Sequence, residues 1–438
     1  MSDADQPGLF DELLGAPDRD LCPGARPVLS VGPDDEPDYL ANLEEHEETR
    51  VVLERRGRYH GEWSVLAERS DRDPVPLTAR LHQRWHAARP IVLRGLVDPT
   101  EATEPLGERA RLGEELGEAC VLREFLERHI DPSGGVWELG GPARLADPER
   151  DLERHWIRWH SEPGTPGTPR MNDLWAKSAW LSTHEDDRSV RLRLSFGSEG
   201  RGDASRDLRR HRRVEELAEL LLPECSLLHD SPALRERLET WLGDEVLFTQ
   251  HIGYWNAPGG GALFHHDAFD EPVLGGQRGV VFTQLIGRTA WLALSVDDLA
   301  HRVEEFLGYL GEGELPWVRK ALFRHPRDLD RALEVSSDPR RARRELVRPG
   351  CGLFGAVVER GPEFTAFLAD GGHAHLLDPG DAIILPNHGL GRTCMHSVFC
   401  ADEATSYGLS MAIREQHPPE PPPDTPRRST RRRRGADR

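Results

Sequence analysis

One segment of the 438-residue chain concentrates side chains that can bind a metal ion. Residues 256–270 read NAPGGGALFHHDAFD, a Gly-rich turn followed by a short expected strand that carries His265 and Asp267. Residues i and i+2 of a strand face the same side, so this imidazole and carboxylate can grip one ion while His266 points away. Completed by a distant second imidazole, they would form the facial triad of non-haem Fe(II) sites, which leaves three positions open.

A second imidazole is available downstream, in a section that we expect to be rich in strands. Residues 379–381 (PGD) read as a turn, AIILP as a strand, and His396 as the start of another strand, HSVFC. A closed or stacked β-structure brings such distant strands together. His388, in PNHG, competes for the role of third ligand, and His396 is preferred because a strand fixes a ligand better than a loop does.

Purely structural roles for the same residues remain open. His265 and Asp267 also suit a hydrogen-bonded pair in a polar strand, and the glycines before them suit a plain turn. A second strand-spaced pair, His373 and His375, would form a different metal site together with His388.

The elements that must position these side chains predict a mixed helix and strand protein. Residues 189–196 (SVRLRLSF) alternate apolar side chains with Arg191 and Arg193, which indicates a half-buried strand. Ser231 as N-cap, Pro232 at the first helical position and Gly243 as stop predict a helix between them. The sections EVLFTQHIGYW, GVVFTQLIG and TAWLALS read as strands. We therefore expect an α+β protein whose C-terminal half is a β-sandwich or barrel with helices packed outside.

Composition divides the chain into four expected parts. The ends differ from the body, because the first is rich in Asp, Glu, Pro and Gly and the last is rich in Pro and Arg. The parts are an acidic disordered N-terminus (1–45), a mixed region leading into a domain that begins near residue 78 (46–250), a catalytic core with a charged helical insertion at about 297–347 (251–415), and a disordered tail (416–438).

Net charge and residue counts exclude several classes of protein. With 56 basic and 76 acidic residues the formal net charge is −20, which disfavours a general nucleic-acid coat. The Arg-rich tail is the one segment expected to contact RNA or another anion, and a freely solvated tail is the alternative. The sequence has two lysines, Lys177 and Lys320, and we expect Lys177 to be an ordinary surface residue.

The compartment follows from what the sequence lacks. It has no apolar run of about 18 residues, so we expect no transmembrane helix. Its start, MSDADQPGLFDELLG, has neither the basic nor the apolar region of an export signal. None of the six cysteines forms a CxxC pair. We therefore expect a cytoplasmic protein.

The motifs resemble a known family. NAPGGG, HHD, FTQLIGRTAW, DPGDAIILP and HSV look like the JmjC branch of the cupin-like Fe(II)/2-oxoglutarate oxygenases, close to the bacterial ribosomal-protein hydroxylases. WHAARPIVLRGLVDP and LETWLGDEVLFTQHIGYW are similar to the upstream parts of such domains, so the resemblance covers about 78–415. It implies a double-stranded β-helix of the cupin or jelly-roll type with flanking helices and a helical insertion. It also implies Fe(II) held by His265, Asp267 and His396, with 2-oxoglutarate as cosubstrate.

The sequence departs from the family where a cation is expected. The family places Lys or Arg two residues after the glycine of GRT, to pair with the far carboxylate of 2-oxoglutarate. Here that position is Thr289. The adjacent Arg288 could be aimed inward by a bulge, and Tyr254 could add a hydroxyl. A longer gap than usual between Asp381 and His396 keeps His388 open as third ligand.

The leading hypothesis is a hydroxylase or demethylase that acts on a protein side chain or a small metabolite. Two alternatives remain: a non-catalytic cupin-like module that binds a partner, and a metal-dependent hydrolase in which the ion lowers the pKa of its bound water.

Overall fold

The computed structural model describes residues 77–416, apart from 103–105, 131–134, 163–168, 183–186, 200–201, 203–204, 270–276 and 361, together with strands at 30–31, 49–55 and 58–65. Most of the expected disordered N-terminus and residues 417–438 lie outside the described residues. None of the helices in the described part combines the length and the apolar character that a membrane span requires.

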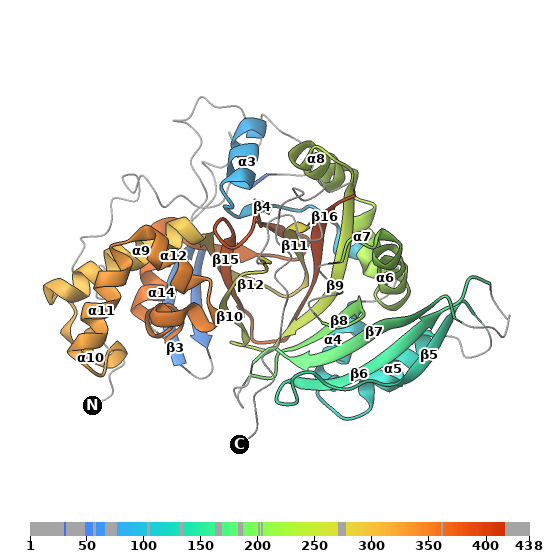
Figure 1. Cartoon of the computed structure of the whole chain (residues 1–438). Coiled ribbons are helices and arrows are strands. Elements are labelled where there is room, and N and C mark those ends of the chain that lie inside the picture. Colours follow the sequence, from blue (N-terminus) through green and yellow to red (C-terminus); the bar gives the residue numbers. More distant parts are fainter. Residues whose placement is uncertain are drawn as a thin grey trace, which may run out of the picture.

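Two stacked β-sheets form the centre of the molecule (Figure 1). The larger sheet has the order β1-β4-β14-β11-β16-β9-β8-β7-β6-β5 and the smaller β10-β15-β12-β13. Strand pairs are antiparallel except β1 with β4. The larger sheet consists of β1 (Ser30–Val31), β4 (Ile91–Leu93), β5 (Trp137–Pro142), β6 (Asp151–Trp159), β7 (Met171–Trp180), β8 (Val190–Phe196), β9 (Val246–Asn256), β11 (Gln277–Ile286), β14 (Ala382–Pro386) and β16 (Ser406–Glu415). The smaller consists of β10 (Gly261–His265), β12 (Thr289–Ser295), β13 (Ala374–Leu377) and β15 (Cys394–Cys400), and β2 (Thr49–Arg55) pairs with β3 (Arg58–Val65) as a separate hairpin.

From β9 onward the chain passes back and forth between the two sheets, except that β12 and β13 are consecutive strands of the smaller sheet. β9, β11, β14 and β16 belong to the larger sheet, and β10, β12, β13 and β15 to the smaller. β16 lies between β9 and β11, so that Ser410 pairs with Ile252 on one side and Phe282 on the other. Side chains far apart in the sequence therefore become neighbours in the space between the sheets.

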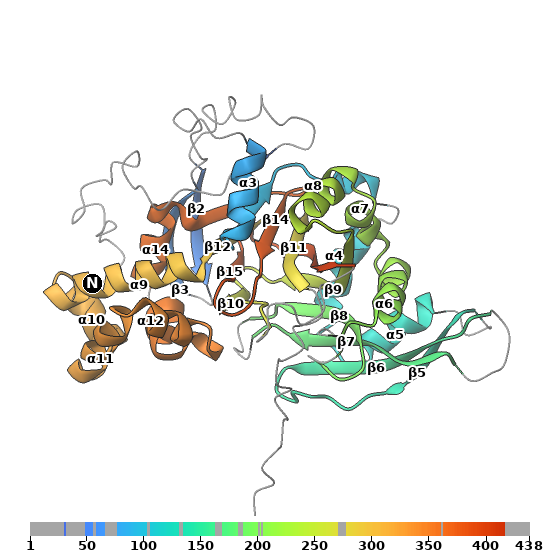
Figure 2. The ribbon, with the colours of Figure 1, turned by 45° about the horizontal axis from the view of Figure 1, so that its top comes forward.

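Helices cover the outer faces of both sheets (Figure 2). Those packed on the larger sheet are α3 (Leu77–His86), α4 (Leu106–Glu115), α5 (Val121–His129), α6 (Leu208–Leu221), α7 (Ser226–His229) and α8 (Pro232–Leu242). Those packed on the smaller are α9 (Val296–Glu312), α10 (Pro316–Leu322), α11 (Pro326–Ser336), α12 (Pro339–Leu346), α13 (Gly355–Arg360) and α14 (Pro362–Leu368). Short 3₁₀ segments occur at η3 (Pro99–Glu101), η4 (Pro223–Cys225) and the kinked η6 (Pro349–Phe354), and a π-helical turn occurs at η7 (Ala369–His373).

Local sequence explains several of these elements. The helix predicted from Ser231, Pro232 and Gly243 is confirmed as α8: the Ser231 side chain accepts from the backbone N–H of Leu234, and Gly243 is left-handed at φ 71°. β12 carries apolar side chains on both faces because both faces are buried, one between the two sheets and the other under the helices. Its Trp291 points between the sheets, while Leu292 packs against the helices. The helices α9 to α12 occupy the segment where the insertion was expected.

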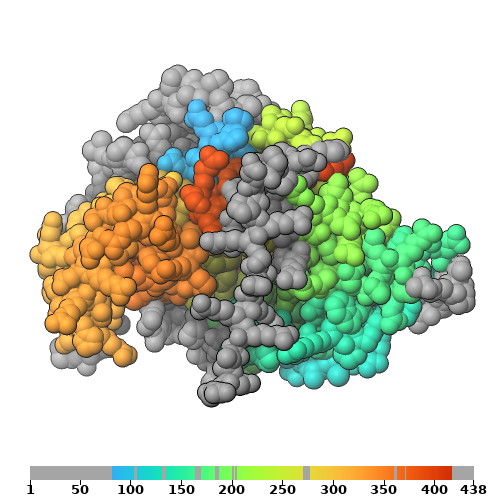
Figure 3. Space-filling view, in the orientation of Figure 1, coloured from blue at the N-terminus to red at the C-terminus, as the bar shows by residue number. Residues whose placement is uncertain are grey.

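The larger sheet continues past β9 into β8, β7, β6 and β5, which project from the body opposite the α9–α12 helices (Figures 1 and 3). In β8 the apolar residues Val190, Leu192 and Leu194 pack under the helices, so Arg191 and Arg193 face the other way, as the alternation predicted.

The expectation that Lys177 lies on the surface is wrong. Its side chain, in β7, is 3% exposed, and its Nζ lies 2.7 Å from a carboxylate oxygen of Asp151 and also contacts Glu199. Two carboxylates brought in by neighbouring segments compensate the buried ammonium, and no local pattern in β7 reveals them.

Candidate metal centre

His265 and His396 meet across the smaller sheet. β10 ends at His265, and His396 is its Cα partner in β15, past a register shift that begins at Ala262. The two ring centroids lie 4.2 Å apart. The hydrogen-bonded ladder therefore fixes the backbone under both imidazoles, as expected for a ligand on a strand.

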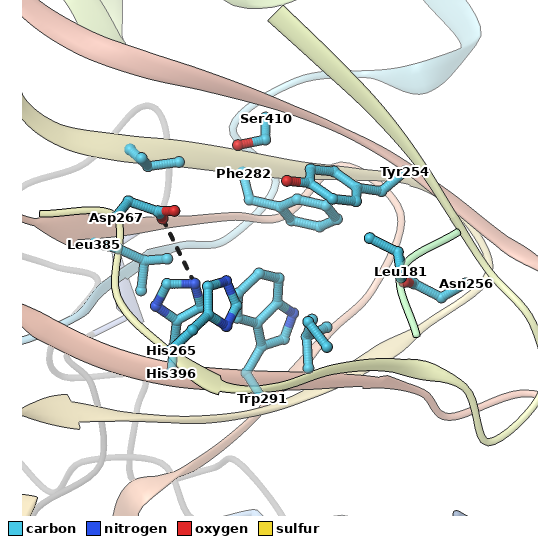
Figure 4. Close-up of a pocket in the computed structure, with 13 residues that line it drawn as sticks. Leu181, Tyr254, Asn256, His265, Asp267, Phe282, Trp291, Leu385, His396 and Ser410 are labelled. Carbon is cyan, nitrogen blue, oxygen red and sulfur yellow. Dashed lines mark ion pairs between the residues drawn. The ribbon is translucent and has the colours of Figure 1, made fainter. Parts of the chain in front are cut away.

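Asp267 completes a group of three potential ligands. It follows the end of β10 rather than lying within it, and its Oδ2 is 3.7 Å from Nε2 of His396 (Figure 4). One ligand atom from each of His265, Asp267 and His396 lies within 4.8 Å of the other two. Within the described part of the chain, no other group of three His, Cys, Asp or Glu residues meets this criterion.

The protonation of these groups suits a cation. Nδ1 of His265 lies 2.7 Å from the carbonyl oxygen of Leu263, which can only accept, so Nδ1 is the donor and Nε2 is the nitrogen available to a cation. Burial and the neighbouring His265 lower the pKa of His396 to about 3, so this imidazole is neutral at pH 7. Burial acts to raise the pKa of Asp267, but the adjacent His396 and His265 outweigh it and leave that pKa below its ordinary value.

The other candidate histidines lie elsewhere. His266 points away as expected, with Nε2 3.0 Å from the carbonyl oxygen of Val347. His388 donates from Nε2 to the carbonyl oxygen of Trp85 at 2.7 Å, and burial lowers its pKa to about 4. His373 lies 3.4 Å from the Arg302 guanidinium. None of the three belongs to the group around Asp267.

A pocket of about 420 Å³, including the open space at its mouth, is lined in part by the three potential ligands. Its wall is mainly aromatic and aliphatic, and Figure 4 shows Tyr254, Phe282 and Trp291 around it. Apart from His265, Asp267 and His396, the lining residues with polar side chains include Tyr254, Asn256 and Ser410. None of the described residues that line the pocket is Lys or Arg. The lining is Leu181, Tyr254, Asn256, Ala262, His265, Asp267, Val280, Phe282, Trp291, Leu385, His396, Val398 and Ser410.

The structure separates the three residues expected to bind a cosubstrate. Tyr254 lines the pocket, whereas Arg288 and Thr289 do not. The expectation that Arg288 binds the cosubstrate is not met in the structure. Its side chain is 43% exposed and forms an ion pair with Asp402 at 2.8 Å, and the Asp402 carboxylate also accepts a hydrogen bond from the backbone N–H of Arg288. A carboxylate after β15 thus holds Arg288 outside the pocket.

Thr289 is likewise placed in a structural role. Its hydroxyl donates to Oε1 of Gln284 at 2.6 Å and accepts from Nε1 of Trp291 at 2.9 Å. The next inward-facing residue of β12, Trp291, fills the pocket wall with an indole.

Sequence reasoning missed Asn256, Ser410, Trp291 and Arg191. The first three line the pocket, and Arg191 is the Cα partner of Tyr254 across the β8–β9 ladder. The alternation in β8 signalled that Arg191 and Arg193 share a face, but nothing local signalled which strand lies beside them.

The sequence matches no protein-family model and no curated protein. Among solved structures the chain is similar to YcfD, a ribosomal oxygenase from Escherichia coli (14% identity, TM-score 0.25, 78% of this chain and 52% of that chain). It is also similar to the non-heme alpha-ketoglutarate-dependent epimerase SnoN from nogalamycin biosynthesis (11%, 0.29, 77% and 83%). A third match is an oxidoreductase of the 2OG-Fe(II) oxygenase family from Burkholderia pseudomallei (9%, 0.26, 78% and 92%). The chain thus spans about half the length of YcfD.

Proposed function

We propose that this protein is an Fe(II)- and 2-oxoglutarate-dependent oxygenase. The observation that carries the proposal is the group formed by His265, Asp267 and His396, whose ligand atoms lie within 4.8 Å of one another. Two imidazoles and one carboxylate form the facial triad of non-haem Fe(II) oxygenases, which leaves positions open for a bidentate oxo acid and O₂. A wholly protein-bound structural site would instead close the coordination sphere.

The arrangement of strands supports the same proposal. The passage of β9 to β16 between two facing antiparallel sheets, with β12 and β13 consecutive in the smaller one, is consistent with a double-stranded β-helix of the jelly-roll type, which is the fold that we propose. In this fold the ligands lie at the end of one strand, β10, and within its neighbour, β15, at the mouth of the space between the sheets.

The chain's own residues have separable roles in this proposal. His265, Asp267 and His396 would hold Fe(II). When bound, Fe(II) would supply oxidising chemistry in which O₂ is the oxidant: one oxygen atom would enter the substrate and the other the succinate that forms, with carbon dioxide, from 2-oxoglutarate, and a hydroxylated N-methyl group would leave as formaldehyde. The apolar wall that includes Phe282 and Trp291 excludes water from the reacting centre.

The substrate class follows from the pocket only in outline. The pocket opens beside His265, Asp267 and His396, and we propose that the substrate is a protein side chain or a small metabolite that reaches these residues through that opening. The cytoplasmic location remains a prediction from the sequence.

The test is anaerobic purification, addition of Fe(II) and 2-oxoglutarate, and measurement of the visible charge-transfer band and of succinate after O₂ is admitted. We expect both signals in the wild type and neither in His265→Ala. Metal binding without either signal would favour the hydrolase. Retention of metal by His265→Ala, with no turnover in the wild type, would refute the oxygenase.

A further inference from the structure

The proposed cosubstrate has a second carboxylate for which the pocket lining provides no cation. An anion taken from water into an apolar cavity needs a charged partner or several donors. The described lining residues include neither Lys nor Arg, and the inward positions of β12 carry Thr289, Trp291 and Ala293. Arg288 is held outside by Asp402. Within the described part of the chain, a cation for this carboxylate would have to come from behind the lining.

Arg191 lies beside Tyr254, close enough to act on its phenol. The two residues are Cα partners in the antiparallel β8–β9 ladder, so their side chains project from the same face of the larger sheet. The Arg191 guanidinium acts on the Tyr254 phenol both as a positive charge and through a side-chain hydrogen bond. Nε of Arg191 is buried and has no hydrogen-bond partner, so the guanidinium has donor capacity left.

Tyr254 is placed to pass this charge on to a ligand. In Figure 4 the hydroxyls of Tyr254 and Ser410 lie on the same side of the pocket, across from the two imidazoles. Burial raises the pKa of Tyr254, so the phenol keeps its proton and remains a donor. Arg191 then donates to the phenol oxygen while the phenol O–H donates into the pocket, and each bond polarises the other.

We propose that Arg191, acting with the hydroxyls of Tyr254 and Ser410, recognises the carboxylate of a dicarboxylic oxo acid at the end remote from the metal. The inference rests on the proposed function. In this proposal the cation comes from β8, which precedes the eight strands β9 to β16 that form the two facing sheets around the pocket. Arg191 would act as a positioning and specificity residue.

The test measures binding rather than turnover, in Co(II)-loaded protein by titration calorimetry. The probes are 2-oxoglutarate and 2-oxopentanoate, which has a methyl group in place of the remote carboxylate. We expect the wild type to prefer 2-oxoglutarate. Arg191→Met should weaken 2-oxoglutarate binding on the order of 10- to 100-fold and leave 2-oxopentanoate and Co(II) binding unchanged. Arg191→Lys should recover part of the preference, and Tyr254→Phe should lose part of it.

Arg288→Met is the matched control, because it removes an arginine that the sequence had favoured and the structure places outside the pocket. It should keep the full preference. Loss of the preference in Arg288→Met with retention in Arg191→Met would overturn the assignment. If Arg191→Met does not fold, an unchanged preference in Tyr254→Phe would overturn it instead. A wild type that binds Co(II) but neither oxo acid would refute the proposed function itself, a result distinct from failure of the Arg191 assignment.

Discussion

His265 and His396 are Cα partners in one antiparallel ladder, although four strands and six helices separate them in the described sequence. Their ring centroids lie 4.2 Å apart, and the third potential ligand, Asp267, follows His265 by two residues. The ladder and the helices packed behind it hold this geometry, so a change at either histidine tests the site without removing the frame.

Replacement of His396 by alanine should abolish tight metal binding. Loss of one of three protein ligands should weaken Fe(II) or Co(II) binding by at least 100-fold, measured by equilibrium dialysis under anaerobic conditions. His388→Ala is the control, because His388 bonds to the Trp85 carbonyl and is not part of the group. Equal losses in the two variants would contradict the choice of His396.

Thr289→Val should reduce stability without weakening 2-oxoglutarate binding. The change leaves Gln284 and Trp291 without their buried hydroxyl partner, which should cost about 1–3 kcal/mol of unfolding free energy in denaturant titrations. Thr289→Ser keeps the hydroxyl and should be close to wild type. A weaker affinity for 2-oxoglutarate in Thr289→Val alone would show that this residue touches the cosubstrate after all.

The two lysines allow a matched comparison of buried and exposed charge. Lys177→Met removes the ammonium between Asp151 and Glu199 and leaves a buried carboxylate uncompensated, so we expect a loss of about 3–5 kcal/mol in unfolding free energy. Lys320→Met, on the exposed face of α10, should change stability by less than about 0.5 kcal/mol. Similar values for both variants would rule out the ion-pair role of Lys177.

We expect the free energy of unfolding to decrease as the pH rises from 4.5 to 7, because of the buried carboxyl group of Glu215. Burial and the neighbouring Glu219 raise its pKa from 4.5 to about 7. The folded state therefore binds this proton more tightly than the unfolded state, and the stability it contributes is lost as pH rises through 7. Glu215→Gln should be more stable than wild type at pH 8 by about 2 kcal/mol, allowing for its partial exposure. The exposed Glu216→Gln serves as control, and a flat wild-type profile over this range would contradict the assignment.

Local patterns sufficed for elements whose signals are short-range. Ser231, Pro232 and Gly243 bound a helix by capping chemistry, and the alternation in β8 indicates its two faces. The HHD spacing also predicted His265 and Asp267 as neighbours on one face of a strand; the structure brings them together, although the strand ends at His265 and Asp267 follows it.

The residues that local patterns missed or placed wrongly owe their positions to contacts with residues distant in the sequence. The position of the Arg288 side chain is set by its ion pair with Asp402, which lies in the loop after β15. The burial of Lys177 is made possible by its ion pairs with Asp151 and Glu199. Arg191 acquires its role from the register of β8 on β9. Each of these partners is distant in sequence, and no local rule specifies which charge meets which.

The position of β16 between β9 and β11 also sets when a nascent chain can complete its architecture. β11 ends at Ile286 and β16 begins at Ser406, so at about 5–20 residues per second the ribosome needs roughly ten seconds to supply the missing strand. Throughout that interval β9 and β11 each present an open edge. The last strand thus closes the sheet after all the described helices have been made, and the interval before closure is when the chain is most exposed to aggregation and to chaperones.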